Sequence, residues 1–363
     1  MPTRNLIDGK PRLRSRWWLI ALAILVAPGC SDSTETTTSA PDTTRLDEAF
    51  TTTSPVTTTI GAPPPTIAQA FQRLSEMGTL RALTAEVTDG HCRPIDSVNI
   101  GEPAPIGSIF ELYVLAALGE AVVSGDVAWD DGIVIRDELR SVPAGVLQEM
   151  SRGEVVTIRE MAELMISDSD NTATDHLIAM LGRETVESVM VSYGNSSMDL
   201  NTPLLDTREL SALKVGPASG LRISWLNSNE EERRAILDQI SDITPGDIPV
   251  RDWVDPVDPH LLQWFATPED LCNLAIGLDS LASSVPEVGD ILMANSGVPP
   301  EAGTWERVWF KGGAEPGMVA TWWMTGVDGR TFLTAGSVVD PDEPIESEEA
   351  SLLFAAIRDL LAP

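Results

Sequence analysis

The chain has few lysines, histidines, cysteines and tyrosines for its 363 residues. It contains three lysines, three histidines, three cysteines and two tyrosines. One lysine lies near the N-terminus, so Lys214 and Lys311 are the two that remain in the body of the chain. With 24 basic and 55 acidic residues, the formal net charge is −31. A surface this acidic repels nucleic acid and anionic lipid headgroups, and we expect neither as a partner.

The scarce histidines also limit the chemistry that we expect. His91, His176 and His260 are scattered and do not have the spacing of a zinc site. The sequence has no glycine-rich loop typical of phosphate binding. We therefore expect no metal and no cofactor, and we interpret His176 as a packing or surface residue of a helix.

The first 30 residues have the pattern of an export signal. Five basic residues precede an apolar run at 17–27, which is too short to cross a bilayer comfortably. The run ends in A-P-G-C, which resembles a bacterial lipobox. We expect a signal peptide over residues 1–30, lipidation of Cys30, and attachment to the extracytoplasmic face of the bacterial membrane. The alternative is cleavage nearby, with Cys30 lost or left as a free thiol.

The remaining chain divides into a spacer and a folded part. Residues 31–65 are rich in Thr, Ser and Pro and poor in large apolar residues, which predicts a disordered tether. Residues 66–363 have enough apolar content for a substantial core. Cys92 and Cys272 are either a disulfide, as an oxidising compartment would permit, or two buried thiols.

Periodicity within residues 66–363 predicts an α+β fold. A first helix and two strand-like runs around Asp89-Gly90 are followed by a buried helix, a long helix-and-loop region, three strands and a closing helix. We expect the outer segments to share one antiparallel sheet flanked by helices. This gives an α/β lobe of about 66–123 and 291–363, with an all-helical lobe of about 124–290 inserted.

Three short motifs could supply serine acyl transfer, which needs a nucleophile, a base, oxyanion donors and an acid for the leaving group. Ser108 opens the buried helix, and Glu111 lies one turn further on. Residues i and i+3 share one helix face, so the Glu111 carboxylate could reach the Ser108 hydroxyl and act as a general base. The other two are S-D-N at 169–171 and K-G-G at 311–313.

Each motif also has a purely structural interpretation. Ser108 and Glu111 could form a capping box at the helix start. The S-D-N segment could be a turn in which Thr172 caps the next helix, and Lys311 could be an exposed strand lysine.

The order and setting of the motifs resemble the penicillin-recognising serine hydrolases, in particular class A β-lactamases, over residues 68–363. The signatures of that family are S-x-x-K, S-D-N and K-T-G. The resemblance implies a β-lactamase/transpeptidase-like fold, a β-lactam or peptidoglycan fragment as ligand, and a monomer. It implies Ser108 as the acylated nucleophile and Ser169 as a proton relay. It further implies Lys311 as a catalytic residue that sets the local positive field, and a substrate-binding set in which Ala314 N–H completes the oxyanion hole: Asn171, Gly312, Gly313 and Ala314.

The chain departs from the family pattern at three points. Glu111 replaces the lysine of S-x-x-K, so that its charge and that of Lys311 sum to zero. Gly312 lacks the hydroxyl of K-T-G. Between residues 187 and 209 the carboxylates are Asp199 and Asp206, neither in an E-x-x-L-N context, and Asp206 is expected to cap a helix. We expect a serine hydrolase with weak or altered activity, or alternatively a lapsed relative that binds a cell-wall ligand or a protein partner.

Overall fold

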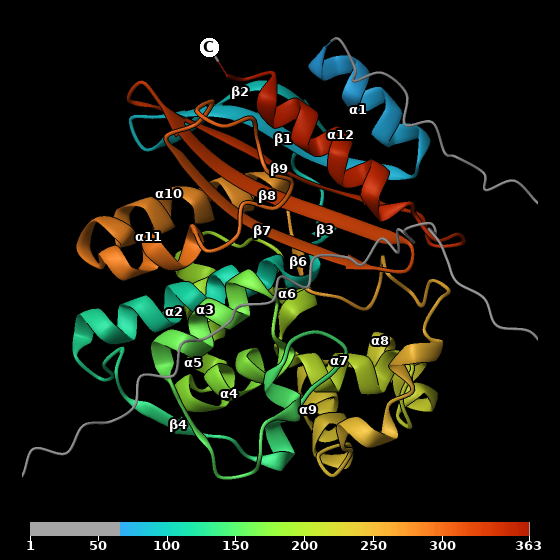
Figure 1. Cartoon of the computed structure of the whole chain (residues 1–363). Coiled ribbons are helices and arrows are strands. Elements are labelled where there is room, and N and C mark those ends of the chain that lie inside the picture. Colours follow the sequence, from blue (N-terminus) through green and yellow to red (C-terminus); the bar gives the residue numbers. More distant parts are fainter. Residues whose placement is uncertain (1–65, 363) are drawn as a thin grey trace, which may run out of the picture. The chain divides into compact units, whose positions relative to one another are not determined.

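The structure of the protein is a computed structural model that describes residues 66–362 (Figure 1). The signal peptide, the lipidation of Cys30 and the tether all lie outside the described residues. The predicted α+β class is confirmed, because helices flank both faces of one antiparallel sheet. The strand order in this sheet is β2-β1-β9-β8-β7.

The two ends of the described chain build this sheet together. β1 (Thr79–Thr88) and β2 (His91–Val98) come from the start, and β7 (Arg307–Glu315), β8 (Met318–Val327) and β9 (Arg330–Val339) from the end. β1 joins the two sets by pairing antiparallel with β9, with Leu83 opposite Ala335. β7 is an edge strand, so one of its sides remains available to contact other elements.

Side chains alternate between the two faces of the sheet. Trp323 on β8 packs into a core shared with α1 (Ile67–Glu76) and α12 (Ser347–Asp359). The preceding Trp322 belongs to the larger core on the opposite face. α10 (Pro268–Ser284) and α11 (Pro286–Leu292) cover that second face (Figure 1). α10 falls in the segment that we assigned to the helical lobe, yet it contacts β1, β2 and β9.

The large core surrounds α2 (Glu111–Ser124), which a short 3₁₀ turn, Gly107–Phe110, precedes. Residues 107–124 are apolar enough to cross a membrane by composition, but two thirds of this stretch is buried in the protein. The remaining elements of the helical region and its small strand pairs are β3 (Ala104–Pro105), β4 (Gly132–Val134), β5 (Val155–Thr157), α3 (Ile158–Ser167), α4 (Asn171–Leu181), α5 (Arg183–Ser192), α6 (Met198–Asn201), α7 (Thr207–Lys214), α8 (Arg222–Asn227), α9 (Glu230–Gln239) and β6 (Phe265–Ala266).

A disulfide links the sheet to α10, one of the helices that cover its second face. Cys92 on β2 is bonded to Cys272 on α10, 180 residues further along the chain. The open choice between a disulfide and two free thiols is therefore resolved in favour of the disulfide in this structure.

Candidate active site

Ser108 lies on the 3₁₀ turn between β3 and α2. The chain before it is fixed by pairing of β3 with β6 and by the Ile106 N–H, which donates to Trp264 O at 2.9 Å. Gly107 has φ +51°, in the left-handed region that glycine tolerates. The turn then runs directly into α2, so Ser108 is held at the end of a buried helix.

The alternative interpretation of Ser108 and Glu111 as a capping box is wrong. α2 begins at Glu111, and the residue before the turn, Ile106, makes no side-chain cap. The Glu111 N–H instead donates to Ser108 O, which closes a 3₁₀ turn and places side chains 108 and 111 on the same side. The Glu111 carboxylate is directed to other partners, and among the described residues none forms a side-chain hydrogen bond with Ser108 Oγ.

Three of the predicted site residues meet in one buried cluster. Ser169 Oγ donates to Glu111 Oε1 at 3.1 Å, and Lys311 Nζ donates to Ser169 Oγ at 2.8 Å. Lys311 Nζ also lies 3.0 Å from Glu111 Oε2, and these two side chains are 3% and 0% exposed. The interpretation of Lys311 as an exposed strand lysine is therefore wrong. We call Glu111, Ser169 and Lys311 the buried cluster.

Burial dominates the electrostatics of Glu111. Loss of hydration raises the pKa of its carboxyl to about 7, although Lys311 and Ser169 favour the charged form and act in the opposite direction. The nearby negative charge of Asp170 adds to the increase. A carboxyl with a pKa near neutrality can take and return a proton under physiological conditions, as a general base must.

Ser169 and Asn171 are presented by a strained turn at the start of α4. Ser169 has φ +52°, and Asp170, not Thr172, caps the helix through its side chain. The Asp170 carboxylate accepts three backbone N–H bonds, two of them from residues 146 and 147 on a distant loop. The alternative interpretation in which Thr172 caps this helix is therefore wrong. His176 is buried, and its Nε2 accepts from Arg136 N at 3.0 Å, as expected for a packing residue.

A small pocket of about 100 Å³ opens beside half-buried Ser108. Asn171 and Ala314, two of the predicted substrate-binding residues, contribute to its wall. The side chains of the buried cluster are not part of this lining. The cluster is nevertheless close to the pocket along the chain, because Asn171 is two residues after Ser169 and Ala314 is three residues after Lys311. Ala314 belongs to edge strand β7. The outer side of an edge strand has backbone N–H groups without a partner in the sheet, and such groups can donate to an oxyanion.

Sequence reasoning missed a second buried lysine–glutamate pair at the pocket. Lys214 at the end of α7 forms an ion pair with Glu315, and their side chains are 0% and 6% exposed. Gln263 Nε2 donates to the other oxygen of Glu315 at 2.9 Å. The scarcity of lysine marked Lys214 as informative, but no local pattern identifies a partner 101 residues away.

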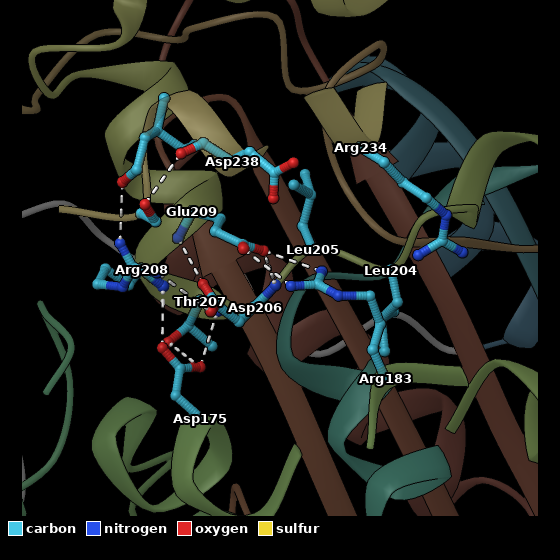
Figure 2. Close-up of polar contacts among 12 residues, drawn as sticks. Asp175, Arg183, Leu204, Leu205, Asp206, Thr207, Arg208, Glu209, Arg234 and Asp238 are labelled. Carbon is cyan, nitrogen blue, oxygen red and sulfur yellow. Dashed lines mark hydrogen bonds and ion pairs between the residues drawn. The ribbon is translucent and has the colours of Figure 1, made fainter. Parts of the chain in front are cut away.

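The two carboxylates considered for deacylation are not at the pocket. Asp206 caps α7 in a capping box with Glu209, and Glu209 also pairs with Arg183 (Figure 2). The carboxylate of Asp175 accepts hydrogen bonds from the N–H groups of Thr207 and Arg208. The expectation that Asp206 caps a helix is thus confirmed, and Asp199 is exposed on α6.

The same region contains a partial match that we missed. Residues 197–201 read S-M-D-L-N, so a serine stands at the glutamate position of E-x-x-L-N. Ser197 is buried, and its hydroxyl has no hydrogen-bond partner within the described chain. The spacing of Leu200 and Asn201 was the signal that could have identified it.

The close approach of β7 to the 3₁₀ turn yields a first prediction. A Cβ on Gly313 would lie 2.6 Å from Ser108 N and 2.8 Å from Ile106 O, both backbone atoms. We expect Gly313→Ala to separate β7 from the turn, lower the melting temperature, and reduce acylation of Ser108 at least about 100-fold. Gly101→Ala, which has open space around it, is the matched control. Unchanged acylation in Gly313→Ala would show that this contact does not position the serine.

Among residues 66–362, no group of three or more His, Cys, Asp or Glu side chains has the arrangement of a metal site.

Comparison with known proteins places the fold. Residues 67–233 match the model of the "Beta-lactamase enzyme family". A β-lactamase from Sphaerobacter thermophilus is 20% identical with a TM-score of 0.58, covering 81% of this chain and 95% of its own. PBP-A is 18% identical with a TM-score of 0.55, covering 83% and 99%. An ancestral class A β-lactamase is 19% identical with a TM-score of 0.54, covering 81% and 99%. No curated protein matches.

Proposed function

Because the chain has the fold of class A β-lactamases and matches the β-lactamase enzyme family over residues 67–233, we propose that it is a serine hydrolase acting through Ser108. The observation that carries this proposal is the buried cluster of Glu111, Ser169 and Lys311, joined to Ser108 by one turn of 3₁₀ helix and by β7. We further propose export and lipid attachment at Cys30, on the evidence of the N-terminal sequence alone.

In the proposed reaction, Ser108 Oγ attacks the carbonyl of a β-lactam, amide or ester. Glu111, on the same side of the 3₁₀ turn, accepts the serine proton, and Ser169 passes a proton to the leaving group. The N–H groups of Ser108 and Ala314 stabilise the oxyanion. Lys311 donates to Ser169 Oγ and thereby orients the hydroxyl between the base and the substrate.

Turnover of a chromogenic ester or β-lactam by wild type, Ser108→Ala and Ser241→Ala tests the proposal. Ser241 is exposed and distant in sequence, so Ser241→Ala should behave as wild type. Loss of turnover in Ser108→Ala alone supports a serine hydrolase that acts through Ser108. Equal turnover in all three proteins contradicts this proposal.

A second candidate is a non-catalytic relative that keeps the fold and binds a ligand. It is favoured by one observation: the Glu111 carboxylate already pairs with Ser169 and Lys311, and Ser108 Oγ has no side-chain partner among residues 66–362. In this case neither wild type nor Ser108→Ala reacts, while a Glu111→Lys variant, which restores S-x-x-K, gains Ser108-dependent labelling by fluorescent penicillin.

The raised pKa of Glu111 predicts the pH dependence of acylation. A general base works only when deprotonated, so the rate should rise with pH through about 7 and level off near pH 8. In Glu111→Gln the residual rate should lose this rise, because the titrating group is gone. Stopped-flow measurement of the acylation burst between pH 5.5 and 8.5 tests both statements. A wild-type profile that is flat over this range would exclude Glu111 as the base.

A further inference from the structure

Both lysines of the described chain are buried at the Ser108 site, and each is paired with a glutamate. Lys311 pairs with Glu111, and Lys214 pairs with Glu315. Moving a proton within either pair leaves its total charge at zero, so neither pair presents a net positive charge to the pocket. The second glutamate is a neighbour of Ala314, on the strand that flanks the serine.

A further negative charge lies beside the Lys311–Glu111 pair. Asp170 follows Ser169, is fully buried, and accepts hydrogen bonds from three backbone N–H groups. Among the described residues that line the pocket, Glu315 is the one with an ionisable side chain. The pocket wall therefore offers no cation to balance a substrate carboxylate, and an unpaired charge is costly to bring into such a site.

The shape and polarity of the pocket favour a small, uncharged group. Apolar side chains form much of the wall, among them Leu210, Trp253 and Trp264. The volume of about 100 Å³ is well below the roughly 300–1,000 Å³ of sites that enclose drug-sized ligands. Next to Lys311, Gly312 has no side-chain hydroxyl to bind an anion.

We propose that the Ser108 site takes short-chain neutral acyl esters and discriminates against substrates that carry a carboxylate beside the scissile bond. This inference rests on the proposed function, since it concerns what Ser108 accepts. In the reaction, Ser108 Oγ forms a bond to the acyl carbon, the ester C–O bond breaks, and the serine proton ends on the leaving alcohol. Water then releases the acid and restores the serine hydroxyl.

The acetate esters of 3-hydroxybenzamide and 3-hydroxybenzoate form a matched pair that tests the proposal. They have nearly the same shape and differ by one charge on the leaving group. We expect the second-order rate constant for Ser108-dependent phenol release at pH 8, after subtraction of the Ser108→Ala rate, to be at least about tenfold larger for the amide. Each ester's spontaneous hydrolysis is subtracted in parallel.

Glu315→Gln tests the electrostatic cause, because it removes the negatively charged side chain that lines the pocket. The ratio of the two rate constants should fall at least about fivefold towards the carboxylate ester. Wild type provides a second measurement that does not depend on the folding of this variant. Below pH 7 Glu111 takes up a proton, so the charge of the buried cluster, which lies beside Asp170, becomes more positive by one unit. The ratio of the two rate constants should therefore also fall between pH 8 and pH 6.

The possible outcomes distinguish a failure of this inference from a failure of the proposed function. Ser108-dependent reaction that favours the neutral ester, with a ratio that narrows as described, supports both. Ser108-dependent reaction that is equal for the two esters, or faster for the carboxylate, overturns the inference and leaves the serine hydrolase intact. Absence of Ser108-dependent reaction with either ester overturns the proposed function, and the inference with it.

Discussion

Replacing Glu111 by alanine is expected to lower the free energy of unfolding by about 3–5 kcal/mol, the cost of leaving one member of a buried ion pair alone. The Lys311 side chain is 3% exposed, and Glu111 is its counter-charge in the buried cluster. Without the carboxylate, the ammonium group must either lose its proton or draw water into the core. Urea unfolding of wild type and Glu111→Ala at pH 8, where the carboxyl is ionised, measures the difference.

The double variant Glu111→Ala, Lys311→Met supplies the decisive comparison. It removes both charges and fills the space of the lysine with an apolar chain, so it should recover most of the lost stability. Glu86→Ala, which breaks the exposed contact with Arg330, should leave the unfolding midpoint nearly unchanged. The result is contradicted if the double variant loses as much free energy of unfolding as Glu111→Ala and Lys311→Met lose in sum. The two groups would then not be coupled, and the contact would not be an ion pair.

The second large effect concerns the fate of the acylated enzyme. We expect one equivalent of product in a rapid burst, followed by deacylation slower than acylation by about 10²–10⁴, the usual contribution of a positioned base. Within the described part of the chain, the carboxylate lining the pocket is Glu315, which is held by Lys214 and Gln263. Intact-mass measurement after removal of excess ester should show the acetylated protein persisting.

Asp199→Asn is the matched control for this prediction, because Asp199 is an exposed carboxylate in the region where a deacylating group was expected. Its deacylation rate should equal that of wild type. Rapid recovery of the unmodified mass in wild type, with continued turnover, would contradict the prediction. Slower recovery in Asp199→Asn would identify this residue as the base.

The sheet was predictable because its signals are local. Turn residues at Asp89-Gly90 and Asp328-Gly329 separate runs of alternating or continuous apolar character, and each run became a strand. The buried helix after Ser108 was predictable for the same reason, since its apolar residues occupy nearly every face.

Two alternative cap interpretations, at Ser108 and at Thr172, were wrong because distant contacts outweigh local preference. Thr172 is a good N-cap residue by type, but the Asp170 carboxylate is fixed at the helix start by N–H groups 23 and 24 residues earlier in the chain. Glu111 would reach back to Ser108 in an isolated helix, yet it turns to Ser169 and Lys311, which the fold delivers from 58 and 200 residues away. Such partners become visible only when the chain is folded.

The mapping of the acyl group by peptide mass spectrometry tests the central claim most directly. After brief reaction of the folded protein with 3-acetoxybenzamide, digestion should yield one modified peptide, with the acetyl group on Ser108. The same treatment of Ser108→Ala should leave that peptide and all others unmodified. An acetyl group on Ser169, or on any other residue while Ser108 stays free, would contradict the account.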